Sequence, residues 1–190
     1  MRLTKKGEYS LRTLIRLGVA HRMGREVVSV STLAESEKLP FKFLEQILGD
    51  LRQAGYIESR RGKFGGALLA KPMEKIVLGD VVRLIDGRLA PIGCASETDY
   101  EKCTCPDEAH CGLRMIMIDV RNAISRILDR YTLADVVGVT LRKMEREGLP
   151  LPFTEKPAPV KKAGRKATDI RHADPEDGFL NWLLGKPLST

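Results

Sequence analysis

The stretch PFKFLEQILGDLRQAGYIESRRGKFGGALLAKP, residues 40–72, decides the fold of this chain. Its first part places apolar residues three or four positions apart, which predicts an amphipathic helix over about residues 40–54 that ends at Gly55. Two short apolar runs, at 56–59 and 67–70, then flank a basic tip that is rich in glycine. The stretch therefore predicts a helix that is followed directly by a basic β-hairpin.

Upstream of this stretch, the apolar spacing predicts a helix over residues 9–23, and the β-branched run at 27–30 predicts a short strand. Ser31 or Thr32 can cap a further helix that begins at about residue 33. A tight turn joins this helix to the amphipathic one, and such a pair is typical of a helix-turn-helix. Two helices and then a basic hairpin predict a winged helix-turn-helix.

Three more helices are expected downstream, over residues 76–86, 112–131 and 133–147. The longest carries a wide apolar stripe, which predicts pairing with a second copy of the chain, and a homodimer suits a palindromic operator. The predicted fold class is mainly α with a small β-hairpin wing, a winged helix-turn-helix followed by a long dimerisation helix. The stripe consists of Leu113, Ile116, Met117, Val120, Ala123, Ile124, Ile127, Leu128 and Tyr131.

These elements divide the chain into four parts. We expect a winged-helix DNA-binding domain at 1–86, a cysteine-containing loop at 87–111 and dimerisation helices at 112–147. The composition of 148–190, rich in Pro, Lys, Ala and Asp, predicts a flexible tail. Within that tail, the apolar segment at 179–184 is expected to dock as a short helix on the body or on a partner subunit.

The positive charge is concentrated in the first part of the chain. The formal net charge is +7, and residues 1–86 hold 16 Lys and Arg against 10 Asp and Glu, whereas residues 87–150 hold 9 against 10. A basic domain favours polyanions such as double-stranded DNA through release of counterions. The chain has no long apolar run and begins with a polar stretch, so we expect no membrane span and a cytoplasmic protein.

The second helix of the pair would enter the major groove with its N-terminal residues. Lys42 can bind phosphate or guanine, Gln46 can pair with adenine, and Glu45 can accept a hydrogen bond from cytosine. The alternative is that these side chains form only the solvated face of a surface helix.

The hairpin tip supplies a second candidate DNA contact. Arg60, Arg61 and Lys63 stand beside glycines that allow close approach to a groove, and arginine favours a narrow minor groove. The alternative is an exposed hairpin whose charges only increase solubility.

All four cysteines, Cys94, Cys103, Cys105 and Cys111, fall within 18 residues. In a cytoplasmic chain such a group indicates metal or redox chemistry before it indicates disulfides. A zinc ion held by four thiolates is one alternative, and thiol switching without a cofactor is another.

The chain resembles the IscR and NsrR type of winged-helix regulators, members of the bacterial Rrf family. The resemblance is carried by MRLTKKGEYSLRTLI at the start, the LEQ-x-L-x-x-LR-x-AG-x-I stretch, the RG-x-x-GG wing, and the cysteine loop before a long helix. It covers about residues 1–147 and implies a dimeric transcription factor, often one that senses through an iron–sulfur cluster. By this resemblance, Glu45 takes part in operator discrimination and Arg61 enters the minor groove.

The resemblance also implies a set of cluster ligands in the loop at 87–111. Cys94 and Cys111 match the first and third cysteines of cluster-binding members. Cys105 is favoured as the second because it lies six positions before Cys111, and Cys103 is an addition. Glu8, from the first helix of a second copy, is the leading fourth ligand of a 2Fe-2S or 4Fe-4S cluster, with Cys103 and His110 in reserve.

The predicted function is therefore a homodimeric transcriptional regulator, a repressor in the first instance, whose operator affinity follows the state of the cluster. A cluster-free, zinc-based or thiol-based regulator of the same fold is the alternative. An enzyme such as a thiol oxidoreductase is disfavoured, because the chain has no Cys-x-x-Cys within a βαβ pattern. A protein adaptor that acts through the segment at 179–184 is a further alternative.

Overall fold

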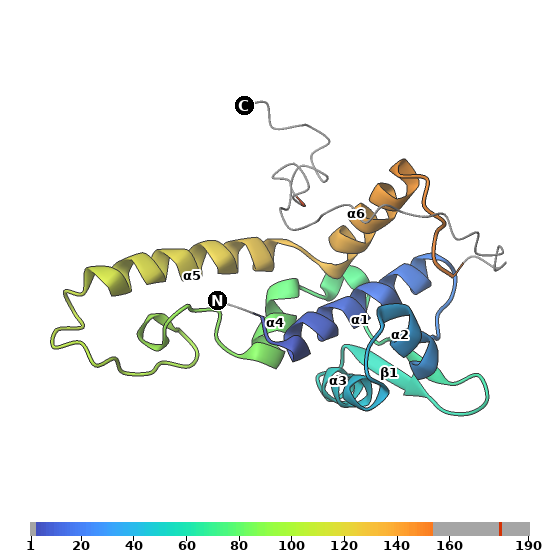
Figure 1. The fold of residues 1–190 in the computed structure, drawn as a ribbon, viewed down its shortest axis with the longest axis horizontal. Helices are drawn as coiled ribbons and strands as arrows, with labels where there is room; N and C mark the ends of the chain where they lie inside the picture. The colour runs from blue at the N-terminus through green and yellow to red at the C-terminus, as the bar shows by residue number, and fades with distance from the viewer. Residues whose placement is uncertain (1–2, 154–178, 180–190) are drawn as a thin grey trace.

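The computed structural model describes residues 3–153 and Phe179. Within this part the chain is mostly helical, with one antiparallel two-stranded hairpin, which confirms the predicted fold class (Figure 1). The helices are α1 (Lys5–Arg22), α2 (Val30–Glu37), α3 (Phe41–Gln53), α4 (Leu78–Asp86), α5 (Gly112–Arg130) and α6 (Leu133–Arg146), and the strands are β1 (Ile57–Arg60) and β2 (Gly66–Leu69). Two short 3₁₀ turns, η1 (Met73–Lys75) and η2 (Gly93–Ala95), complete the order.

The first helix begins earlier than the apolar pattern predicts. The Thr4 side chain accepts a hydrogen bond from the Gly7 N–H at 3.0 Å, so Thr4 caps α1 and the helix starts at Lys5. The expected start at residue 9 is therefore wrong by one turn. That first turn is polar and carries no periodic signal, so only the cap could have revealed it.

The second helix also begins earlier than expected. The Ser29 hydroxyl accepts a hydrogen bond from the Thr32 N–H at 3.1 Å, and α2 therefore starts at Val30. The predicted strand over residues 27–30 is wrong except at Val28, which forms an isolated antiparallel bridge with Ala67 of the hairpin. A local cap has overridden the β-branched composition of this segment.

The helix and hairpin of the opening stretch are confirmed. α3 buries Leu44, Ile47 and Leu51 and exposes its opposite face. In the hairpin Ile57 lies opposite Leu69, and Arg60 lies opposite Gly66. The position of Gly66 requires glycine, because an added Cβ would collide with the Val28 carbonyl. This close approach fastens the hairpin to the segment before α2.

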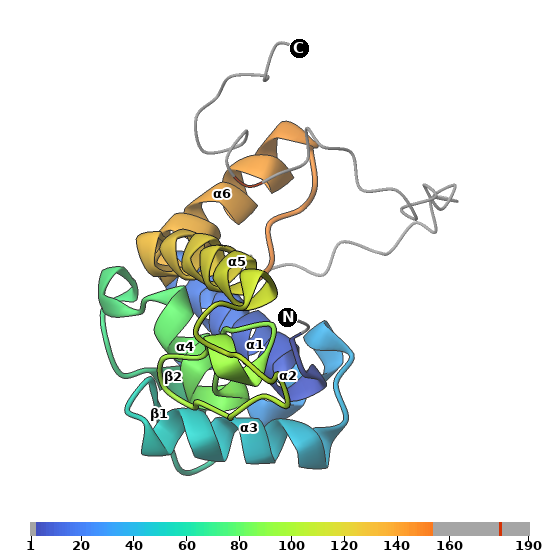
Figure 2. The same ribbon diagram turned by 90° about the vertical axis from the view of Figure 1, so that its left-hand side faces the viewer.

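One apolar core joins most of these elements, and α1 runs through its centre. Leu14 and Leu17 of α1 are almost fully buried, and Leu133 and Val137 of α6 belong to the same cluster. Gly18 lets the two helices approach closely, because a Cβ there would lie 2.7 Å from a methyl group of Val137. Figure 2 shows the layers that result, with α5 above α1 and α4 and with α3 below them.

The fifth helix extends away from this core together with the cysteine loop. None of the residues 112–130, all of which the structure describes, is buried. The loop lies alongside α5, because Arg114 donates to the Cys94 carbonyl at 2.9 Å and Arg121 donates to the Ala95 carbonyl at 2.7 Å. The two segments form an arm at the end of the molecule opposite the hairpin tip (Figure 1).

The sixth helix begins where the sequence predicts. Thr132 and Asp135 form a reciprocal capping box at its N-terminus. Of the predicted tail, residues 154–178 and 180–190 lie outside the described residues, as does most of the apolar segment at 179–184. In the part of the chain that the structure describes, no helix is both long and apolar enough to cross a lipid bilayer.

Candidate functional site

Helix α3, the predicted DNA-recognition helix, presents its predicted DNA-contacting residues to solvent. Lys42, Glu45 and Gln46 are exposed on α3, on the face opposite its buried leucine and isoleucine side chains. Phe41, at the N-terminus of the helix, is 47% exposed. The outer face of α3 is thus exposed at its N-terminal end, the end with which such helices contact base edges.

The hairpin tip is basic and exposed as predicted. Arg60 ends β1, and Arg61 and Lys63 follow it in the turn, where Gly62 adopts a φ of +106° that other residues rarely reach. The sequence reasoning missed Phe64. Its ring is 85% exposed and lies 5.8 Å from the Lys63 ammonium. An aromatic residue between glycines at a loop tip was the signal that could have found it.

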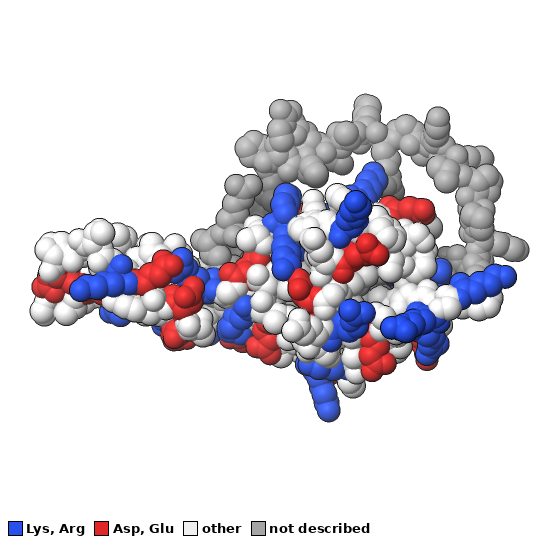
Figure 3. Space-filling model, turned by 90° about the horizontal axis from the view of Figure 1, so that it is seen from below, with Lys and Arg blue, Asp and Glu red and all other residues white. Residues whose placement is uncertain are grey.

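The helix and the hairpin lie on the same side of the molecule. In Figure 1 both occupy its lower edge, and Figure 3 views that edge directly. Lys and Arg side chains are prominent toward the hairpin end of this view, whereas acidic and basic side chains alternate along the arm. The surface that combines the exposed face of α3 with the hairpin tip is called the α3–wing surface below. Its shape and charge suit a DNA duplex.

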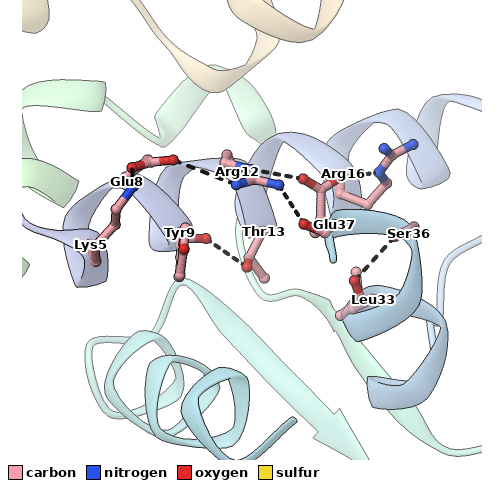
Figure 4. Close-up of polar contacts among 9 residues, drawn as sticks. All are labelled: Lys5, Glu8, Tyr9, Arg12, Thr13, Arg16, Leu33, Ser36 and Glu37. Atoms are coloured by element: carbon pink, nitrogen blue, oxygen red, sulfur yellow. Dashed lines mark hydrogen bonds and ion pairs between the residues drawn. The ribbon is translucent and has the colours of Figure 1, made fainter. Parts of the chain in front are cut away.

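An ion-pair network fixes the helix pair to α1 (Figure 4). Glu37, at the end of α2, accepts from Arg12 at 3.1 Å and from Arg16 at 2.6 Å. The Glu37 side chain is only 11% exposed, so this pairing is shielded better than a surface salt bridge. The network holds α2, and with it the start of α3, in a set orientation on α1.

Glu8, the predicted fourth cluster ligand, belongs to the same network. Its carboxylate contacts Lys5 at 2.8 Å and Arg12 at 3.5 Å, both on α1. The hydrogen bond from Lys5 and the neighbouring positive charges lower the pKa of Glu8. The carboxylate is therefore ionised near neutral pH, and its side chain is partly exposed.

The four cysteines are free thiols that lie in a row along the loop. Burial, followed by the proximity of Cys103, raises the pKa of Cys94, the one buried thiol. Hydrogen bonds with Cys103 and then Cys111 raise the pKa of Cys105 to about 11. Cys103 therefore contacts the thiols on both sides of it, and Cys105 lies between Cys103 and Cys111.

A partly buried carboxylate that the sequence reasoning missed contacts this row. Glu108 accepts hydrogen bonds from the Tyr100 hydroxyl at 2.9 Å and from the Cys103 thiol at 3.5 Å. It also pairs with Arg114 of α5 at 3.3 Å, and Arg114 in turn holds the Cys94 carbonyl. No pattern in the sequence links these residues, because their contacts arise only when the loop folds back on α5.

His110, the reserve ligand, lies on the outside of the loop. Its Nδ1 atom is 2.7 Å from an oxygen of Asp107, and its side chain is 84% exposed. This hydrogen bond lowers the pKa of Asp107. The structure thus brings the four cysteines together and leaves His110 beside a carboxylate at the surface.

The thiols suit an iron–sulfur cluster in number and in chemical kind, since thiolates are the usual ligands of such clusters. They are not arranged around one point: among residues 3–153 and 179, no group of three or more His, Cys, Asp and Glu side chains is placed to hold a single metal ion. Thiolates also bind zinc, so the donor set is compatible with either centre.

The apolar stripe of α5 is divided between two faces. Met117, Ile124 and Leu128 are half-buried against the rest of the chain. The exposed members recur at alternating spacings of three and four, which is the pattern of a helix seam that pairs with another helix. These exposed residues are Leu113, Ile116, Val120, Ala123 and Ile127.

Comparison with known proteins gives consistent matches over this part of the chain. A family model described as Rrf2, iron-dependent transcriptional regulator, matches residues 3–138. The transcriptional regulator NsrR of Bacillus subtilis is 35% identical over 137 residues, which cover 72% of this chain and 90% of the relative. The relatives are named as regulators, which is consistent with a protein that is not an enzyme.

Two solved structures have the same architecture. CymR, the global cysteine regulator of B. subtilis, superimposes with a TM-score of 0.60 at 30% identity, over 73% of this chain and 97% of that one. T. potens IscR superimposes with a TM-score of 0.57 at 27% identity, over 79% of this chain and 93% of that one. The mostly helical fold with its hairpin is thus shared with known transcriptional regulators.

Proposed function

Because this chain belongs to the Rrf2 family of transcriptional regulators, we propose that it is a homodimeric DNA-binding regulator whose operator affinity follows the state of an iron–sulfur cluster. The observation that carries the DNA-binding part is the α3–wing surface, where exposed Lys42, Glu45 and Gln46 share one side of the molecule with a basic hairpin tip. The observation that supports the sensing part is the row of four adjacent thiols on the arm.

The DNA contacts divide into two kinds. Glu45 and Gln46 read base edges in the major groove, while Lys42 binds phosphate or guanine. Arg60, Arg61 and Lys63 approach the minor groove from the hairpin tip. The first kind gives sequence preference, and the second adds affinity that falls as the salt concentration rises.

The dimer forms through α5. Its exposed stripe would be covered by the same stripe of a second copy, because an isologous interface presents one patch twice. The remainder of the predicted division follows from this arrangement: residues 1–86 bind DNA, 87–111 hold the cluster, and 112–147 form the dimer. α6 also contributes to the core around α1, so a shift at the interface would reach the DNA-binding part directly.

The cluster would be held by Cys94, Cys105 and Cys111, with Glu8 from the first helix of the second copy as fourth ligand and Cys103 in reserve. When bound, the cluster supplies a redox-active centre that reacts with oxidants such as oxygen or nitric oxide. The protein positions the ligands: Arg114 fixes the backbone at Cys94. Cys111 occupies the N-cap position of α5, directly before the first turn of the helix that would form the dimer.

The test is anaerobic purification of the full chain, followed by visible spectroscopy, iron and sulfide counts, and operator binding before and after exposure to air. We expect iron and sulfide in equal amounts and an operator affinity that changes severalfold when the cluster is lost. Colourless, iron-free protein whose operator binding responds to thiol oxidants would support the thiol-based alternative. Stoichiometric zinc without sulfide would support the zinc alternative.

A further inference from the structure

A groove with a volume of about 390 Å³ lies along α6, beside the turn that follows the helix. Val139, Met144 and Leu149 line it together with Thr140, Lys143 and Glu147. The lining is mostly apolar, so water is a poor occupant and an apolar side chain is a good one.

Phe179 lies in this groove although it is distant in sequence. It is one of the groove's lining residues, and its ring meets Tyr131 edge-on, with the ring centroids 4.6 Å apart and the planes at 73°. Edge-to-face pairs at this separation are favourable beyond the apolar area that they bury. Phe179 is also the first residue of FLNWLL, residues 179–184, the apolar segment of the C-terminal part.

We propose that the groove of α6 is the docking site for the chain's own C-terminal segment, residues 179–184. The occupant follows from Phe179, which already lines the groove and packs on Tyr131. The segment offers four more apolar residues in the five positions that follow, whereas the sequence on its N-terminal side is charged and rich in proline. Burial of these apolar side chains against an apolar surface is favourable, and the groove offers such a surface.

The connection between the two is long enough for docking within one chain. Residues 150–178 separate the end of the groove from Phe179, and 29 residues can span far more than the width of a small domain. The family match ends at residue 138, and the docking segment lies well beyond it.

The docked segment would touch the corner that joins the arm to the core. Tyr131 lies between α5 and α6, and its carbonyl accepts a hydrogen bond from the Leu78 N–H of α4 at 3.1 Å. Thr132 forms an isolated bridge with Val77 at the same corner. Release of the segment would uncover Tyr131 and loosen this corner, whether or not DNA or a cluster is bound.

Trp182 is the sole tryptophan of the chain and lies within the segment, so its fluorescence reports docking in the full-length protein. We expect a short-wavelength emission and weak quenching by acrylamide. Phe179→Ala or Met144→Glu should shift the emission to longer wavelength and increase quenching severalfold. Gln53→Glu, which adds the same single negative charge at an exposed position of α3, is the matched control and should leave both unchanged.

Two results would overturn the proposal. The first is a Trp182 residue that is as accessible to acrylamide in the native chain as in the urea-unfolded chain. The second is shielding that disappears on dilution to the monomer, because the segment would then occupy the groove of a second copy. Circular dichroism of each variant confirms that the helices remain folded, so that a change in Trp182 reports the segment and not unfolding.

Discussion

Asp86 accepts two hydrogen bonds from Thr4, one from its backbone N–H at 2.9 Å and one from its hydroxyl at 2.5 Å. Asp86 is the last residue of α4 and Thr4 is the cap of α1, so the pair joins the start of the first helix to the end of the fourth. Gly87 and the cysteine loop follow at once. The α1 turn that carries Glu8 is thereby fastened to the base of the loop that carries the thiols.

A double-mutant cycle tests this junction. Gly7 faces the Asp86 carboxylate so closely that an added Cβ would lie 2.5 Å from Oδ2, so Gly7→Ala should lower the free energy of unfolding. In the Asp86→Ala background the crowding is gone, and the same change should stabilise by roughly 0.5–1 kcal/mol, because alanine favours helix over glycine. Urea denaturation of the four proteins measures the coupling.

Asp86→Ala by itself should cost about 1 kcal/mol through the lost hydrogen bonds to Thr4. Asp80→Ala on the same helix is the control, since Asp80 is exposed and its pairing with Arg83 at 3.2 Å is a surface ion pair. Additive effects of the Gly7 and Asp86 changes would contradict the contact.

At the hairpin tip, Arg61→Ala should weaken binding to an operator selected from a random duplex library. The loss should be about tenfold at moderate salt, and the slope of log affinity against log salt should fall by about 1, because one cation that approaches the DNA is removed. Fluorescence anisotropy across a salt series measures both. Arg142→Ala removes an equally exposed cation from α6 and should change neither value.

On α5, Ile116→Glu should convert the dimer to a monomer. Ile116 is 60% exposed in the single chain and lies in the middle of the exposed stripe, where a carboxylate would have to be buried without a partner. Sedimentation equilibrium measures the mass. Arg126→Glu places the same charge on the same helix at an exposed polar position, and a monomer in this variant too would implicate general charge in place of the stripe.

The middle cluster ligand can be assigned by a matched pair of variants. Cys105→Ala should abolish visible absorbance after anaerobic reconstitution, whereas Cys103→Ala should keep iron and sulfide near the parent level. The two thiols are adjacent and differ in their surroundings, since Cys103 donates to Glu108 and Cys105 is exposed. The reverse outcome would move the ligand role to Cys103.

The thiol row also predicts a pH profile for the reduced, metal-free protein. Hydrogen bonds with Cys103 and Cys111 raise the pKa of Cys105 to about 11, so below that pH the thiol form dominates and alkylation is slow. The iodoacetamide rate at Cys105 should rise through pH 9 to 11. Cys103→Ala removes the thiol that raises the pKa of Cys105 most. The pKa of Cys105 should therefore fall, and alkylation at pH 8.5 should become faster. Peptide mass spectrometry of the labelled site follows the rate.

The sequence predicted those parts of the fold that local patterns determine. The spacing of Leu44, Ile47 and Leu51 gave α3, and the glycines around Lys63 gave the hairpin tip. The beginnings of α1 and α2 were missed because caps at Thr4 and Ser29 outweigh polar or β-branched composition. Caps act through single hydroxyl groups, which leave no periodic signal.

The sequence predicted which residues make up the candidate site, but it did not predict the contacts between them. The four cysteines stand close in sequence, so their grouping in space required no knowledge of the fold. Glu108 could not be identified, because its partners Tyr100 and Arg114 meet it only through the path of the loop along α5. The contact between the rings of Phe179 and Tyr131 likewise joins residues that are 48 positions apart in sequence, and no local pattern predicts it.

The Arg12 guanidinium stands between two acidic side chains, Glu8 at 3.5 Å and Glu37 at 3.1 Å. Carboxylates that share one cation compete for it, so a ligand that draws Glu8 away leaves Arg12 to pair more strongly with Glu37. Arg12 also donates to the Glu37 carbonyl, at the end of α2 where the helix dipole favours a cation. A change of ion-pair partner at Arg12 would thus hold α2, the helix that precedes α3, more firmly on α1. Neither a hinge motion nor a domain movement would be needed.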